Sequence, residues 1–253
     1  MAEFRILWDN LWDGGEVDAD SEQTDFPATN TQHIWRKRVW RSDEESGGID
    51  TWIRCEIGES GQEVTAIVIE NHNFTPGAVV TITGSNNPDG IPAGVVVTPD
   101  VTETRIAHFF AEPESWDYWI ISVVDPALTY AEIGRVFLGT YFEFEHHYRK
   151  VTRHTLDPSG RVQSDGGQVA SNQQDRYKAF AFDWSRGAVS DEEVEDLYEV
   201  FEMVGGAVPY WICHDTELPL PDAVYYVLNT RDWSFDPVTW SRWGFALTVE
   251  EAR

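Results

Sequence analysis

The stretch from Trp116 to Glu145 constrains the fold of this chain more than any other. It is dense in β-branched and aromatic residues and shows no 3.6-residue apolar period, which favours strands over a helix. A strand is predicted over Tyr118–Val124, followed by a Pro turn and a second long β segment broken by Gly134 and Gly139. We interpret the stretch as the closing strands of one β domain and the lead-in to a second.

Length and composition allow one large domain or two domains of ordinary size. The 253 residues are 42% apolar, and the 13% of aromatic residues, including 12 Trp, favour β structure and broad contact surfaces. No apolar run is long enough to insert into a membrane. The N-terminal sequence MAEFRILWDN lacks the regions of a signal peptide, so the protein is expected to be made and folded in a cytoplasm.

The net charge excludes one class of partner. The chain carries 44 acidic and 18 basic residues, for a formal charge of −26. Lys and Arg supply most of the affinity for phosphate backbones, so no nucleic acid is expected as a partner. The acids are spread along the chain and predict an acidic surface that stays dispersed until a specific partner covers it.

One basic cluster, His33–Ser42, interleaves aromatic and basic side chains. Such a pattern can clamp single-stranded nucleic acid. The many acids before and after the cluster favour internal ion pairs with that acidic surface, or Trp–Arg stacking within the fold or at a subunit interface. The residues concerned are Trp35, Arg36, Lys37, Arg38, Trp40 and Arg41.

The acidic N-terminal segment has a weak likeness to a calcium loop. Asp9, Asp13, Gly14 and Asp20 fall at the first, fifth, sixth and twelfth loop positions. Leu11 at the third position, and Asp in place of Glu at the twelfth, favour a solvated acidic turn instead. The two cysteines, Cys55 and Cys213, have no neighbour at metal-ligand spacing and are predicted to be reduced and buried.

Short strands separated by turns fill the middle of the first half. Strands are predicted over Thr51–Ile57, Val64–Glu70, Ala78–Gly84 and Arg105–Phe110, and Ala78, Val80 and Ile82 share one face. Residues 86–100, rich in Pro, Gly and Asn, are predicted to form a long loop.

Six short motifs occur in a characteristic order: DFPATN, WRS, IENHNF, AVVTITGSN, YWIISVVD and EIGRVFLG. In this order they resemble the discoidin-like (galactose-binding-like) β-sandwich modules of tail-tip proteins of tailed bacteriophages, over residues 15–142. The resemblance implies structural roles for Asn71, His72 and Asn73 and for the strand starting Tyr118-Trp119-Ile120. It favours His72 as a turn histidine over a metal ligand.

The second block begins near Tyr141. A half-exposed strand is expected to alternate Phe142 and Phe144 with Glu143 and Glu145. The adjacent His146 and His147 would then point to opposite faces, which is poor geometry for one metal. The polar, Gly-rich segment Leu156–Asn172 is either a flexible hairpin tip or an arm that orders against a partner.

A strand and a helix follow in the second block. In the strand Asp175–Trp184, one face is predicted to carry Lys178, Phe180, Phe182 and Trp184. The helix is predicted over Ser190–Met203, with Ser190 and Glu193 forming a capping box and Gly205-Gly206 ending it. Its predicted apolar face comprises Val194, Leu197, Tyr198, Phe201 and Val204, and its outer face Glu195, Glu199 and Glu202.

The predicted fold is therefore mainly β. Residues 1–140 form a discoidin-like β-sandwich (jelly roll). Residues 141–253 form a second β-rich α+β domain with one helix at about 190–204, and this part resembles the second half of phage distal-tail and baseplate-hub proteins.

No motif for catalysis is present. The sequence holds no G-x-S-x-G elbow, P-loop, H-E-x-x-H or C-x-x-C, and the abundance of carboxylates makes any chosen pair uninformative. We therefore predict that the protein is not an enzyme, and assign no catalytic, cofactor-binding or metal-binding residue.

The sequence is consistent with two functions. The resemblance implies a structural virion protein of a phage tail tip: an adaptor that forms a ring, hexamer or trimer, and contacts the tail tube, hub and fibres. Exposed aromatics near Trp233, Trp240 and Trp243 would supply contacts between copies. The alternative is a carbohydrate-binding module for a host-surface glycan, with Trp35, Trp40 and Trp116 as candidates whose structural burial is favoured.

Overall fold

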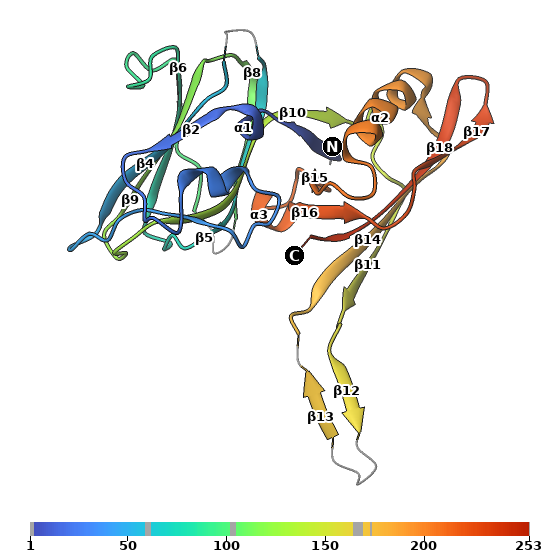
Figure 1. Ribbon diagram of the computed structural model, residues 1–253. Coiled ribbons are helices and arrows are strands. Elements are labelled where there is room, and N and C mark those ends of the chain that lie inside the picture. The colour runs from blue at the N-terminus through green and yellow to red at the C-terminus, as the bar shows by residue number, and fades with distance from the viewer. Residues whose placement is uncertain (1–2, 59–61, 102–104, 164–168, 173, 253) are drawn as a thin grey trace. The chain divides into compact units, whose positions relative to one another are not determined.

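A computed structural model describes residues 3–58, 62–101, 105–163, 169–172 and 174–252. The protein is mainly β, with antiparallel ladders and one long helix, which confirms the predicted fold class (Figure 1). The residues group into two compact units. The β-sandwich unit comprises residues 5–142 and 213–224, and the helix unit comprises the N-terminal residues up to Phe4, residues 143–212 and residues 225–252.

Two sheets face each other in the β-sandwich unit. One has the strand order β1-β10-β5-β8, with the short β3 paired to β10, and the other has the order β2-β4-β9-β6-β7. The strands are β1 Arg5–Asn10, β2 Glu16–Ala19, β3 Trp40–Arg41, β4 Ile49–Glu56, β5 Val64–His72, β6 Val79–Ser85, β7 Val95–Val97, β8 Arg105–Glu114, β9 Tyr118–Asp125 and β10 Glu132–Glu143. Three short helical segments lie beside them: α1 Leu11–Gly14, η1 Ala28–Gln32 and α3 Leu220–Ala223.

The core of the sandwich follows from the period-two alternation of its strands. Val80 and Ile82 are fully buried and Ala78 packs against the same core, as the sequence predicted. Strand β5 confirms the strand predicted over Val64–Glu70, and it is buried along almost its whole length. The core cluster joins residues of both sheets, among them Trp12, Trp40, Ile53, Ile69, Trp119, Ile121, Ile133 and Leu138.

The predicted breaks at Gly134 and Gly139 are wrong, because β10 runs through both without interruption. Each glycine instead admits a neighbouring carbonyl. A Cβ on Gly134 would lie 2.1 Å from the Arg36 carbonyl oxygen, and one on Gly139 would lie 2.1 Å from the Asp9 carbonyl oxygen. The glycines therefore mark close backbone approach and not strand ends.

The predicted loop over residues 86–100 is wrong in part. Residues Val95–Val97 form β7, which pairs antiparallel with β6 at the edge of the five-stranded sheet. The part from Asn86 to Gly94 turns back over that sheet, with the Gly94 N–H donating to the Gly84 carbonyl, and residues 98–100 also lie outside any strand.

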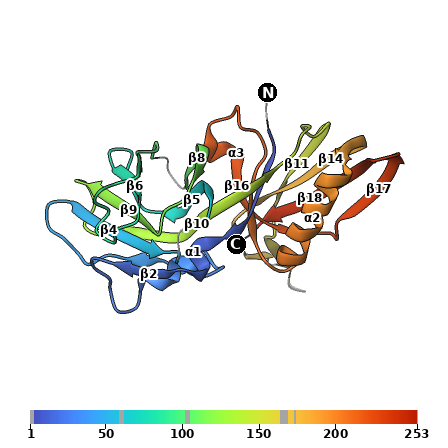
Figure 2. The ribbon, with the colours of Figure 1, turned by 90° about the horizontal axis from the view of Figure 1, so that it is seen from above.

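The helix unit is a sheet with the strand order β11-β14-β18-β16-β15, and β17 also pairs with β18. Helix α2, Asp191–Val204, lies against β14 and β18 (Figure 2). The strands are β11 Lys150–Leu156, β14 Tyr177–Ser190, β15 Tyr210–Cys213, β16 Val224–Asn229, β17 Ser234–Thr239 and β18 Arg242–Glu251.

Helix α2 begins and ends as predicted. Ser190 and Glu193 form both hydrogen bonds of the capping box, and Gly205, with a positive φ of 50°, follows the last helical residue. The buried face differs from the prediction at Tyr198, which is 52% exposed, whereas Val200 is buried. Glu195, Glu199 and Glu202 are exposed, as expected for the outer face.

Aromatic packing fills the helix unit. Phe180, Phe182 and Trp184 are buried on one face of β14, which confirms the predicted alternation. Phe144 stacks on Trp184 at 4.3 Å between ring centroids, and Phe4 meets Phe182 edge-on at 4.8 Å. The chain leaves β10 at Glu143, so the predicted strand stops before Glu145, and His146 and His147 lie outside any strand.

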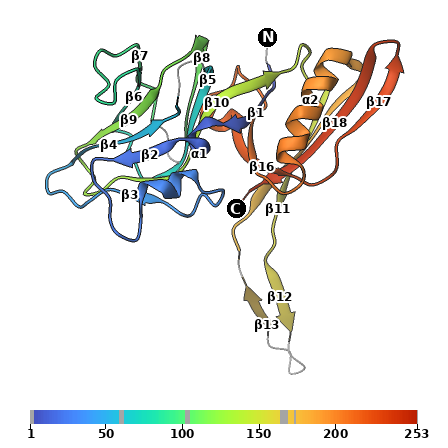
Figure 3. The same cartoon turned by 45° about the horizontal axis from the view of Figure 1, so that its top comes forward.

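A two-stranded ribbon continues the β11–β14 hairpin. Strands β12, Gly160–Gln163, and β13, Val169–Asn172, pair antiparallel with each other and with no other described strand (Figure 3). We call this ribbon the arm. Within the described residues, no helix has the length and apolar character needed to cross a membrane.

Candidate functional site

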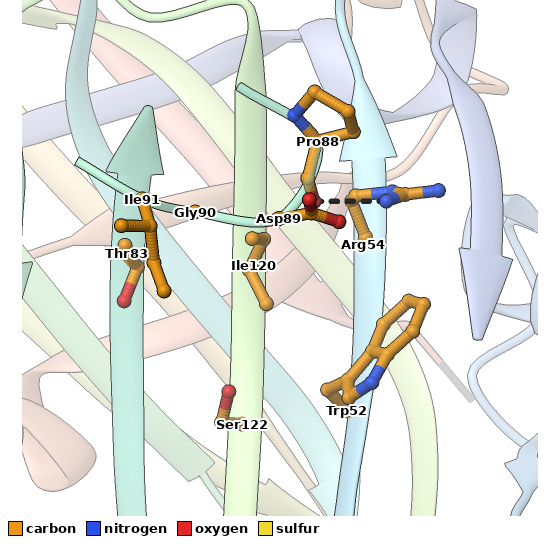
Figure 4. A pocket seen from close by; sticks show the side chains of 9 residues that line it. All are labelled: Trp52, Arg54, Thr83, Pro88, Asp89, Gly90, Ile91, Ile120 and Ser122. Carbon is orange, nitrogen blue, oxygen red and sulfur yellow. Dashed lines mark hydrogen bonds between the residues drawn. The ribbon is translucent and has the colours of Figure 1, made fainter. Parts of the chain in front are cut away.

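A pocket of about 380 Å³ opens on the outer face of the five-stranded sheet of the β-sandwich unit (Figure 4). This volume lies in the range of small-molecule sites, which is roughly 300–1,000 Å³. Three strands and one loop line the pocket. The lining residues are Trp52, Arg54, Thr83, Pro88, Asp89, Gly90, Ile91, Ile120 and Ser122.

Strand alternation places the floor of the pocket. Ile53 and Cys55 of β4 are buried in the core, so Trp52 and Arg54 face outward. The ladder with β9 sets Trp52 opposite Ser122 and Arg54 opposite Ile120. These side chains therefore lie next to one another on a solvent-facing sheet.

Arg54 attaches the loop Pro88–Ile91 to the sheet. Its Nη1 donates to the Pro88 carbonyl at 2.8 Å, and its Nη2 donates to the Asp18 carboxylate at 2.9 Å. The guanidinium carbon lies 5.2 Å from the Trp52 ring centroid, in cation–π range. The loop approaches the floor closely at Gly90, where a Cβ would lie 2.9 Å from the Ile120 side chain.

The pocket combines an apolar surface with a few polar groups. Trp52, Ile120 and Ile91 supply the apolar part, and Thr83, Ser122 and Asp89 supply two hydroxyls and a carboxylate. The nine lining residues include one carboxylate and neither histidine nor cysteine. This chemistry suits a ligand with an apolar face and a polar edge.

None of the three candidate tryptophans, whose structural burial was favoured, lines this pocket. Trp40 is buried in the core, where its indole N–H donates to the Ser21 carbonyl. The Trp116 ring packs against the backbone at Gly94, where a Cβ would lie 2.0 Å from it. Trp35 is exposed, and the Arg38 guanidinium carbon lies 5.2 Å from its ring centroid.

Two arginines of the basic cluster form ion pairs within the β-sandwich unit. Arg36 pairs with Glu70 at 2.9 Å, and the Arg41 Nε donates to Glu132 at 2.7 Å. Internal pairing and Trp–Arg stacking are thus confirmed. The partners, however, come from β5 and β10, and not from the acidic segments beside the cluster in sequence.

The calcium-like segment is spread over several elements. Asp13, at the end of α1, forms an ion pair with Arg135, and Asp20 accepts a hydrogen bond from Thr51. Burial raises the pKa of Asp13 although the Arg135 charge acts in the opposite direction. Among the described residues, no three His, Cys, Asp or Glu side chains are placed to hold one metal ion.

His72 is buried at the end of β5. Its Nδ1 accepts from the Phe74 N–H at 3.2 Å and its ring stacks on Phe74, so it holds the turn, as the resemblance implied. Burial lowers the pKa of His72 to about 4. Cys55 and Cys213 are buried free thiols, as predicted, and burial raises the pKa of Cys55 to about 12.

No family model and no curated protein matches the chain. Solved structures are similar to about half of it. Chitosan-binding module 1 of a chitosanase/glucanase from Paenibacillus sp. IK-5 has 17% identity and a TM-score of 0.43 over 52% of this chain and 99% of that one. The family 32 carbohydrate-binding module of NanJ from C. perfringens, in complex with galactose, has 17% identity and a TM-score of 0.43 over 53% and 98%. A fucose-binding module of Streptococcus pneumoniae has 9% identity and a TM-score of 0.43 over 52% and 95%.

Proposed function

We propose that the β-sandwich unit is a carbohydrate-binding module whose glycan occupies the pocket on the outer face of the five-stranded sheet. The observation that carries the proposal is the half-exposed ring of Trp52 beside Ser122 and Asp89, in a cavity walled by a loop that Arg54 fixes.

Sugar chemistry fits this arrangement. A pyranose ring has a C–H face that an indole ring covers, and a rim of hydroxyls that need both donors and acceptors. Trp52 provides the flat apolar surface, Ser122 and Thr83 both donate and accept, and the Asp89 carboxylate accepts. An anionic nucleic acid does not fit, because the chain carries a net charge of −26.

Replacing Trp52 by Ala is expected to weaken glycan binding at least roughly tenfold, the size of a hot-spot truncation. Isothermal titration calorimetry of the full chain with galactose, fucose and chito-oligosaccharides measures it. Trp240→Ala is the matched control, because Trp240 is 96% exposed and lies in the helix unit. Equal affinity of the Trp52→Ala protein and the wild type contradicts the proposal.

The tail-tip ring adaptor is the second proposal, and the arm favours it. A two-stranded ribbon that pairs with no other strand of the described residues is at best marginally stable in water, so contact with a partner would stabilise it. A virion location is part of this proposal. The exposed Trp240 is a further contact candidate, whereas Trp233 and Trp243 are only half-exposed.

Light scattering tests the ring. The full chain is expected to show three or six times its 28.8 kDa mass, and deletion of residues 157–172 is expected to shift soluble protein toward the monomer. A full-length monomer at high concentration contradicts autonomous ring formation. Loss of soluble protein on deletion would show that the segment belongs to the folded core.

A further inference from the structure

Asp89 carries the one carboxylate among the nine residues that line the pocket. Its backbone N–H donates to the Asn87 side chain at 3.1 Å, which fixes the residue within its turn. Within the described part of the chain, no hydrogen bond or ion pair engages its carboxylate. In Figure 4 its side chain lies between Ile120 and Arg54, at the pocket.

Arg54, the one cationic side chain among the lining residues, already has an ion-pair partner. Arg54 forms its ion pair with Asp18 across the β2–β4 ladder and gives a second N–H to the Pro88 carbonyl. Arg54 therefore acts as a positioning residue for the loop. Because Asp18 balances its charge, the carboxylate of Asp89 leaves the pocket with a net negative charge.

Further acids flank the pocket on the same sheet face. Asp50 and Glu56 occupy the outward positions of β4 on either side of Trp52 and Arg54, and both are exposed. Glu16 of β2 lies opposite Glu56. Charges of one sign around a concave site raise the local concentration of ligands of the opposite sign.

We propose that the glycan bound here carries protonated amines, as an amino-sugar chain does, and that Asp89 is the counter-ion of one of them. This inference rests on the proposed carbohydrate-binding function. The same charges disfavour sialylated and uronate-containing glycans, because a like charge beside Asp89 is repelled.

The test uses two oligosaccharides of the same length: a glucosamine tetramer with protonated amines, and its fully N-acetylated counterpart, which is neutral. Calorimetry with the full chain at about pH 5.5 keeps the amines of the glucosamine tetramer protonated. The wild type is expected to bind the amine form roughly fivefold more tightly, the upper end for an exposed charge pair. Asp89→Asn should abolish this preference, so that the ratio of the two affinities falls to about one.

Asp43→Asn is the control, because it removes an exposed acid of the same unit that does not line this pocket. Loss of the preference in Asp89→Asn but not in Asp43→Asn supports the role of Asp89. Equal loss in both variants, or equal affinity for the two oligomers, overturns the amine inference while the carbohydrate function stands. If neither oligomer binds and the neutral sugars also fail, the proposed function falls with it.

Discussion

Replacing Glu70 by Ala should lower the free energy of unfolding of the β-sandwich unit by about 3–5 kcal/mol, the cost of removing one partner of a buried ion pair. Glu70 is 2% exposed and pairs with both Arg36 and Arg105. Arg105 is itself buried and also donates to the Val224 carbonyl. Removal of the carboxylate takes the Glu70 ion pair away from a guanidinium that is only 7% exposed.

Chemical denaturation followed by tryptophan fluorescence measures this loss. Glu132→Ala is the matched control, because Glu132 also pairs with an arginine, Arg41, but both side chains of that pair are partly exposed. Its cost is expected to be at most about 1 kcal/mol, as for pairs near the surface. Similar losses in the two variants would show that burial does not determine the strength of the Glu70 contacts.

Replacing Gly134 by Ala should destabilise the same unit by about 1–3 kcal/mol or more, because the added methyl overpacks a closed backbone contact. The new Cβ would lie 2.1 Å from the Arg36 carbonyl oxygen, which also accepts a hydrogen bond from the Asn71 side chain at 2.9 Å. A backbone oxygen held in this way cannot move aside as the end of a flexible side chain can.

The control for Gly134 is Gly14→Ala. A Cβ on Gly14 meets nothing within 4 Å, so the change should stay within about 0.5 kcal/mol. Thermal unfolding of both variants under one condition measures the difference. A Gly134→Ala protein as stable as Gly14→Ala would mean that β10 shifts to accommodate the methyl at little cost.

The sequence predicted those features that depend on residues close together in the chain. The alternation of Phe180, Phe182 and Trp184 with polar neighbours, and the capping box at Ser190, each lie within one element and were readable from it. Gly134 and Gly139 were misread because the carbonyls that require them come from distant parts of the chain. Strand β7 was missed for the same reason, since pairing with β6 stabilises it.

The candidate site was missed although the sequence contained a signal for it. Once Ile53 and Cys55 are assigned to the core, alternation directs Trp52 and Arg54 to solvent, and an outward Trp beside an Arg is a binding candidate. The sequence could not show that the loop at Asp89 folds back over these residues. That placement depends on the hydrogen bond from Arg54 to the Pro88 carbonyl, which joins residues 34 positions apart.

The β-sandwich unit is not encoded by one continuous piece of chain. Residues 213–224 return to it, and within this segment the His214 N–H donates to the Ala223 carbonyl while Val224 accepts from Arg105. During translation, a nascent chain that ends at residue 212 has all ten strands of the two sheets but not the Val224 acceptor for Arg105. We therefore expect the sandwich to reach its final stability only late in synthesis. A gene fragment that stops at residue 142 would encode an incomplete sandwich.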